Sequence, residues 1–161
     1  MYTPILATLG FILSPERDQV LLVHRNGRRD DHHYGKYNGL GGKLKPGEDI
    51  YQCLQREIHE EAGIESRGAV LRGTINWPGF GKKKENWFGF IFLVPGFSGQ
   101  PQKANEEGDL EWRYIHELES LPMWEGDRYF LPLVFDDDPR IFHGCMPYKS
   151  GRPVGWTFSR V

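Results

Sequence analysis

The chain has 161 residues and a formal net charge of −2, with 20 lysine and arginine residues against 22 aspartate and glutamate residues. This length favours one domain spanning residues 1–161. Hydrophobic residues make up 39% and aromatic residues 14%, which excludes a disordered chain, and the near-neutral charge excludes a polyelectrolyte surface for polymeric nucleic acid. No apolar run reaches the length of a membrane span and no signal-type segment opens the chain, so we expect a cytoplasmic location.

The first segments predict a hairpin followed by a glycine-rich loop. Residues 5–13 and 19–25 are rich in strand-forming residues and flank a turn at residues 14–18. Gly39, Gly41 and Gly42 come next. Because glycine has no side chain, the backbone of this loop could approach a phosphate or a metal closely, although glycines also serve simply to shape turns.

A helix is predicted over residues 50–62. Asp49, with Gln52 three positions later, is typical of a capping box, and Gly63 supplies a stop signal. Pro46 and Gly47 before it are typical of a turn.

This helix carries three carboxylates within about one turn, at Glu57, Glu60 and Glu61. Ile50 and Leu54 lie on the same stripe as Glu57 and Glu61, so the line begins apolar and continues as acids. A solvated acidic face is the alternative, but unpaired carboxylates at a core margin are rarely tolerated. The cluster indicates a hard cation such as Mg²⁺, which favours carboxylates together with substrate phosphates.

The second half of the chain predicts further strands and one further helix. A helix over Trp124–Val134 would be kinked or delayed by Pro132. The mixture favours an α/β or α+β fold, with the acidic helix packed on a sheet. The strands are predicted at residues 69–77, 86–94 and 110–115, with a final strand in which Val154, Trp156 and Phe158 alternate.

Taken together, the loop and the helix resemble the signature of the Nudix hydrolases. The matching positions are Gly42, Glu48, Arg56–Ile58, Glu60–Glu61 and Gly63–Ile64. The resemblance implies a mixed sheet between helices and cleavage of a nucleoside diphosphate linked to another group. It also implies Mg²⁺, with Mn²⁺ as an alternative. The ligands would be Glu57, Glu60, Glu61 and the carbonyl of Gly42, and Arg56 would brace the loop against the helix.

Shorter matches resemble the MutT-like members of this family, among them the mammalian 8-oxo-dGTP diphosphatases that hydrolyse oxidised purine nucleotides. By this resemblance Asn38 and Asp127 would hydrogen-bond the edge of the base and Trp124 would stack on its face, because an indole offers a broad π surface. Gly126 stands where such enzymes carry a second acid, so only one of the acid pair is kept. Without the resemblance, Trp124 would be interpreted as core and Asn38 as a turn residue. The matches are at residues 37–43, 123–124, 129–133 and 142–144.

Other polar stretches leave alternatives open. Counting back from Trp112, the resemblance places Glu107 where related enzymes carry an additional metal ligand or base, whereas the simpler interpretation is a solvated acidic loop. The basic residues within 24–29 and 82–84 could steer a polyphosphate or merely face water. Adjacent His32 and His33 lack partners at ligand spacing, so we exclude them from the metal site.

The predicted function is Mg²⁺-dependent hydrolysis of a nucleoside triphosphate to a monophosphate and pyrophosphate. The resemblance favours 8-oxo-dGTP or a related oxidised purine, and hence cleansing of the nucleotide pool. Glu57 and Glu107 are both candidates for the general base, since geometry and pKa decide between them. Alternatives are another nucleoside diphosphate derivative such as a dinucleoside polyphosphate or ADP-ribose, a non-catalytic nucleotide-binding module, and a prenyl diphosphate isomerase. The oligomeric state is not indicated.

Overall fold

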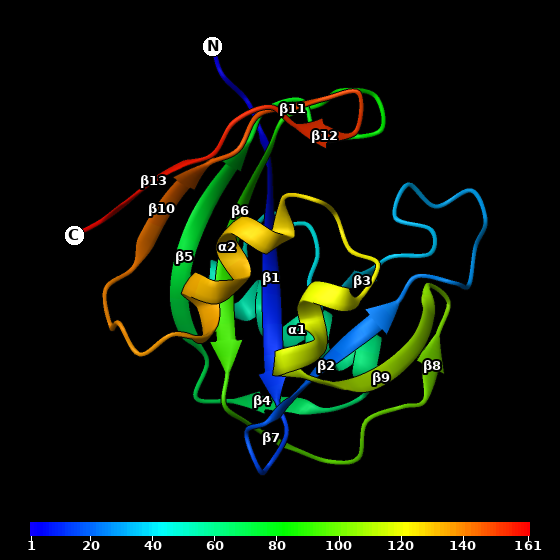
Figure 1. Cartoon of the computed structure of the whole chain (residues 1–161). Coiled ribbons are helices and arrows are strands. Elements are labelled where there is room, and N and C mark those ends of the chain that lie inside the picture. Colours follow the sequence, from blue (N-terminus) through cyan, green and yellow to red (C-terminus); the bar gives the residue numbers. More distant parts are fainter.

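The computed structural model describes residues 1–161, which form two α-helices, one 3-10 helix and thirteen strands (Figure 1). The strands are β1 Ile5–Leu13, β2 Gln19–His24, β3 Tyr37–Asn38, β4 Glu65–Arg67, β5 Val70–Trp77, β6 Trp87–Val94, β7 Gly96–Ser98, β8 Ala104–Asn105, β9 Gly108–Tyr114, β10 Phe142–Cys145, β11 Tyr148–Lys149, β12 Arg152–Pro153 and β13 Thr157–Arg160. The helices are α1 Ile50–Ala62, η1 Ile115–Ser120 and α2 Asp127–Phe135.

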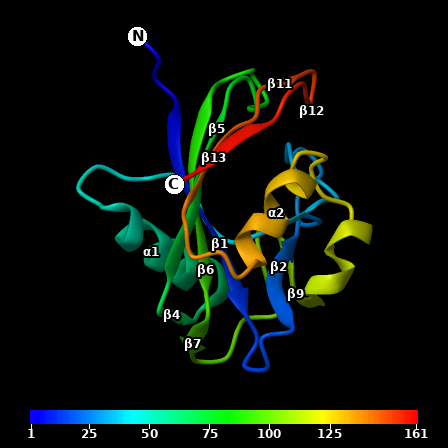
Figure 2. The ribbon, with the colours of Figure 1, turned by 60° about the vertical axis from the view of Figure 1, so that its left-hand side comes forward.

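Nine strands form one mixed sheet in the order β13-β10-β5-β6-β1-β2-β9-β8, with β3 beside β2. The pairs β1–β6 and β10–β5 are parallel, and the other pairs in this sheet are antiparallel. Helices α1 and α2 cover opposite sides of this sheet (Figure 2). The predicted fold class, a mixed sheet between helices, is therefore confirmed. Neither α-helix combines the length and the apolar character that crossing a membrane requires.

Helix α1 has the predicted bounds, Ile50–Ala62, because both of its ends are specified locally. Asp49 and Gln52 form the reciprocal hydrogen bonds of a capping box. Gly63 ends the helix in the left-handed region, at a φ of 70°, where glycine is favoured. The apolar face of the helix buries Leu54 and Ile58 in a cluster with residues of β1, β2 and β6.

Helix α2 begins at Asp127, three residues later than predicted, since the segment before it forms a turn. The Asp127 N–H donates to the Trp124 carbonyl at 3.0 Å, and the Trp124 side chain is buried. Pro132 lies within the helix rather than delaying it. Proline has no N–H to donate to the preceding turn.

The end of α2 is held by arginines from two strands. Arg72 of β5 is only 7% exposed and donates to the carbonyls of Leu133, Val134 and Asp136 at 3.2, 3.0 and 3.1 Å. Arg160 of β13 donates to the Leu133 carbonyl at 3.1 Å. Carbonyls at a helix end have no partners within the helix, so these arginines supply the missing donors.

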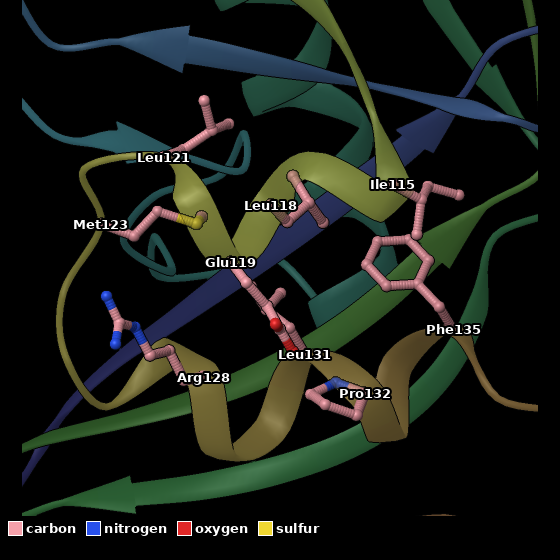
Figure 3. A pocket seen from close by; sticks show the side chains of 9 residues that line it. All are labelled: Ile115, Leu118, Glu119, Leu121, Met123, Arg128, Leu131, Pro132 and Phe135. Atoms are coloured by element: carbon pink, nitrogen blue, oxygen red, sulfur yellow. The ribbon is translucent and has the colours of Figure 1, made fainter.

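The final strand is shorter than predicted. It runs from Thr157 to Arg160 and pairs with β10, while Trp156 and Val154 precede it. The Val154 N–H instead donates to the Pro147 carbonyl at 2.8 Å, beside the short β11–β12 hairpin. A small hollow of about 130 Å³ lies between η1 and α2, with Leu118 and Leu131 on its walls (Figure 3).

Replacing Arg72 with alanine should destabilise the fold by about 2–4 kcal/mol, because the buried Val134 carbonyl would lose its charged donor and the Asp136 carbonyl would lose another. Urea denaturation of the parent and the variant measures this change. Arg140→Ala is the matched control, since Arg140 pairs with Asp138 on an exposed surface and its loss should change little. Equal stability of both variants would contradict the assigned role of Arg72.

Candidate functional site

One cavity of about 750 Å³ brings most of the sequence-predicted site residues together. Its walls differ in chemistry, with acids at one part and aromatic rings at another. Arg56 and Glu60 do not line this cavity. The predicted residues on its wall are Asn38, Gly42, Glu57, Glu61, Glu107, Trp124 and Asp127.

The glycine-rich loop lies against the backbone of β1, where β1 and β2 pair only at their hairpin end. The Thr8 N–H donates to the Gly42 carbonyl at 2.9 Å, and Gly10 and Leu40 exchange backbone hydrogen bonds. A Cβ at Gly41 would collide with the Thr8 carbonyl, and one at Gly42 would lie 2.5 Å from the Glu57 carboxylate. These glycines therefore allow the loop to contact both β1 and α1.

Arg56 joins this loop to α1 through several hydrogen bonds. It donates to the Lys43 carbonyl at 3.1 Å and forms an ion pair with Glu48. It also contacts Glu57 at 2.7 Å and Glu60 at 3.3 Å, both measured from Nη1 to a carboxylate oxygen. The hydrogen bond from Arg56 lowers the pKa of Glu48 to about 2 and so keeps that carboxylate charged.

Glu61 is the least compensated acid of the cavity. Its burial raises the pKa well above the usual value, and the nearby charges of Glu107 and Glu57 raise it further. Glu57 contacts Arg56, but no ion pair involves Glu61. Ionisation of Glu61 is therefore disfavoured beside these acids, and the charge of Arg25 offsets this only in part.

Glu107 reaches this wall from the turn between β8 and β9. Asn105 positions the turn by donating from Nδ2 to the Glu61 carbonyl at 3.0 Å and by accepting from the Glu107 N–H at 2.9 Å. Arg25 lies 3.4 Å from the Glu107 carboxylate and also pairs with Asp31. Glu107 thus faces the helix acids rather than standing in a loop open to solvent.

The acids fit a hard divalent cation in chemistry and in charge. Glu57, Glu61 and Glu107 share one cavity, and their mutual repulsion is what a cation would relieve. No group of three or more acidic, histidine or cysteine side chains surrounds a common point. Arg56 and Arg25 already contact carboxylate oxygens of Glu57 and Glu107, so a bound cation would compete with these two arginines. Glu60 is half exposed and lies at the edge of the cluster.

The aromatic part of the cavity centres on Trp124. Its indole N–H donates to His33 Nδ1 at 2.7 Å. Its ring lies 4.9 Å from the ring of Phe80, and the ammonium of Lys36 lies 4.6 Å from its centroid. Trp124 is thus held firmly while part of it remains on the cavity wall.

Asp127 and Asn38 add polar groups to this part of the wall. Asp127 is half-buried, but its carboxyl group is desolvated. This burial raises the pKa of Asp127 to about 7, against the opposing effects of a backbone contact with Trp124 and the charge of Lys36. Asn38 lies in β3 and makes no side-chain hydrogen bond within the protein, so its amide can donate and accept.

Several cavity residues were not predicted from the sequence. The sequence around His33 suggests only a metal ligand, and the closely spaced rings of Trp77, Phe80 and Trp87 are the one sequence signal of an aromatic wall. Arg28, by contrast, belongs to the basic stretch for which the sequence leaves polyphosphate steering open, and it lines the cavity. These residues come from loops and strand ends, where periodicity carries little information.

The chain matches the NUDIX domain model over residues 4–134. It is 31% identical to an oxidized purine nucleoside triphosphate hydrolase from Danio rerio over 83% of this chain and 81% of that protein. It is 29% identical to the NAD-capped RNA hydrolase NudC from Stutzerimonas stutzeri over 81% of this chain and 45% of that protein. A MutT protein crystal structure from Bacillus halodurans superposes with a TM-score of 0.82 at 27% identity, covering 96% of this chain and 97% of that one.

Glu61→Gln should stabilise the metal-free protein at about pH 8 by about 1 kcal/mol, because it removes a buried charge that its neighbours repel. A carboxyl whose pKa is raised in the folded state contributes stability below its unfolded pKa and loses it as the pH rises through the folded pKa. The gain should therefore vanish at about pH 3, where Glu61 is protonated in both states. Urea denaturation in EDTA at the two pH values measures it.

Glu60→Gln is the control for this prediction, since Glu60 is half exposed and should change the stability little. Addition of MgCl₂ should raise the melting temperature of the parent more than that of Glu61→Gln, because a ligand that binds only the folded state stabilises it. A stabilising effect of Mg²⁺ that is equal in both proteins would show that Glu61 is not a ligand.

Proposed function

The chain belongs to the Nudix hydrolase family, whose members are pyrophosphohydrolases of phosphoric anhydrides in nucleotide derivatives, and we propose that it hydrolyses an oxidised purine nucleoside triphosphate. The products would be a monophosphate and pyrophosphate, and 8-oxo-dGTP is the leading substrate. Such an enzyme would act on the nucleotide pool of the cytoplasm. The observation that carries the proposal is the single cavity that joins the acid cluster to the aromatic and polar wall around Trp124.

Glu57, Glu61 and Glu107 would hold Mg²⁺ or Mn²⁺, with Glu60 and the carbonyl of Gly42 as further oxygen ligands. When bound, such an ion neutralises charge on the phosphate oxygens and lowers the pKa of a coordinated water. Nudix hydrolases in general use divalent cations. The Gly42 carbonyl accepts hydrogen bonds from the Thr8 N–H at 2.9 Å and from the Cys53 thiol at 3.6 Å, and the thiol is a weak donor.

The chain's own residues position the polyphosphate and move the proton. Arg25, Arg28 and Lys43 line the cavity and would pair with phosphate oxygens. Arg56 would hold the loop and α1 at a fixed separation through Lys43 and Glu48. Glu57 and Glu107 are the candidates to take a proton from the attacking water, since each is a cavity carboxylate.

The aromatic part of the cavity would receive the purine. Trp124 offers a π surface, and the amide of Asn38 and the carboxyl of Asp127 offer donors and acceptors for the edge of the base. Similarity to the Danio rerio oxidized purine nucleoside triphosphate hydrolase supports this choice of substrate. Similarity to NudC supports NAD-capped RNA as a second candidate substrate. The acid cluster of this chain would act on that substrate as well.

A substrate panel tests the proposal. Initial rates with Mg²⁺ are compared for 8-oxo-dGTP, 2-hydroxy-dATP, dGTP, a dinucleoside polyphosphate, ADP-ribose and NAD-capped RNA. We expect kcat/KM for an oxidised purine to exceed that for dGTP by about tenfold or more, because buried polar groups discriminate strongly between base edges. Highest activity on dGTP, ADP-ribose or the capped RNA would contradict the proposed substrate.

The dependence of KM on pH provides a second measurement. Asp127, with its pKa at about 7, is an uncharged donor and acceptor below that pH and an acceptor only above it. KM for the purine substrate should therefore change between about pH 6 and about pH 8, and Asp127→Asn should remove this change because an amide does not titrate there. Parallel profiles for the two proteins would exclude Asp127 from base binding.

A further inference from the structure

We propose that His33 is a specificity-determining residue, which fixes the indole of Trp124 through one ring nitrogen and donates a hydrogen bond to an acceptor atom of the nucleobase through the other. The inference rests on the proposed function, in that the aromatic part of the cavity receives the base. His33 lies on the loop between β2 and β3 and lines the cavity.

The contact with Trp124 defines the protonation of His33. The indole N–H can only donate, so His33 Nδ1, at 2.7 Å, must be the unprotonated acceptor. The two rings are nearly perpendicular, with an interplanar angle of 86°. Burial lowers the pKa of His33 to about 4, and the charge of Arg25 acts in the same direction, so the ring is neutral at physiological pH.

A neutral ring that accepts at Nδ1 carries its proton on Nε2. No protein group accepts a hydrogen bond from this Nε2–H, whereas the neighbouring His32 places its own Nε2 3.2 Å from the Phe80 carbonyl. Because His33 is part of the cavity wall, its Nε2–H is a donor available to a ligand. A carbonyl oxygen or an unprotonated ring nitrogen of the base is the matching acceptor.

The backbone around His33 is held in place, which preserves the direction of this donor. Asp31 accepts the His33 backbone N–H at 3.1 Å and pairs with Arg25 at 2.7 Å. The Asp31 side chain is only 5% exposed. Phe80 and Trp124 contact each other and both lie beside the ring, with centroid distances to His33 of 5.9 and 5.5 Å. His33 therefore adds a donor to the cavity wall that also carries the amide of Asn38 and the carboxyl of Asp127.

Three substitutions separate the two roles of the ring. His33→Leu removes both nitrogens. His33→Asn keeps an acceptor at the position of Nδ1 but loses the donor at Nε2. His33→Gln places an amide nitrogen near the position of Nε2 but loses the acceptor for Trp124.

Each variant is assayed with the best purine substrate of the parent, and its near-ultraviolet circular dichroism and melting temperature are recorded. His33→Leu should raise KM about tenfold with kcat within about twofold of the parent, and it should change the tryptophan signal. His33→Asn should keep the parent-like tryptophan signal while KM remains raised, and His33→Gln should recover part of KM without that signal. A loss confined to kcat, or an unchanged KM in His33→Leu at a normal melting temperature, would overturn the proposal.

His116→Leu is the matched control, because His116 stacks on Tyr114 away from the cavity and its replacement should leave KM unchanged. Failure of the proposed function can be told apart from failure of this inference. If the parent prefers a different purine nucleotide, the proposed substrate is wrong, and the same variants are compared on the preferred one. An effect of His33→Leu on that substrate would still support the role of His33.

Discussion

Repulsion among carboxylates at one wall of the cavity is the constraint around which the site is built. Glu57 contacts Arg56 and Glu107 contacts Arg25, whereas Glu61 feels the charge of both acids and has no ion pair. Each arginine is anchored elsewhere as well, so neither can follow the acids freely. The folded chain thus maintains an electrostatic cost that a divalent cation and its phosphate ligand would remove.

The parts of this site that follow from local sequence could be predicted, and the parts that depend on tertiary contacts could not. The bounds of α1 follow from Asp49, Gln52 and Gly63, and the spacing of the acids along a helix follows from its pitch. Spacing alone did not distinguish Glu60, which lies at the edge of the cluster, from Glu61, which lines the cavity. Only the packing of α1 against the glycine loop makes that distinction.

The aromatic part of the cavity was less predictable because its residues come from separate loops. Phe80 belongs to the β5–β6 connection and His33 to the β2–β3 connection, and their meeting at Trp124 depends on the sheet order. The sequence resemblance indicated Trp124 itself, but nothing in the local pattern of His33 distinguished a metal ligand from a partner of an indole. One loop also links both parts of the cavity, since Arg25 contacts Glu107 and Asp31 supports His33.

Arg72 and Arg160 connect the C-terminal end of α2 to strands β5 and β13. Arg160 belongs to the outermost strand of the sheet, yet it contacts Asp136 and Leu133, at the opposite end of α2 from Asp127. Asp127, the first residue of α2, lies on the wall of the cavity, so the contacts at both ends of this helix fix its position. Substitutions in the edge strand β13 should therefore affect how firmly α2 is held, even though no residue of β13 lines the cavity.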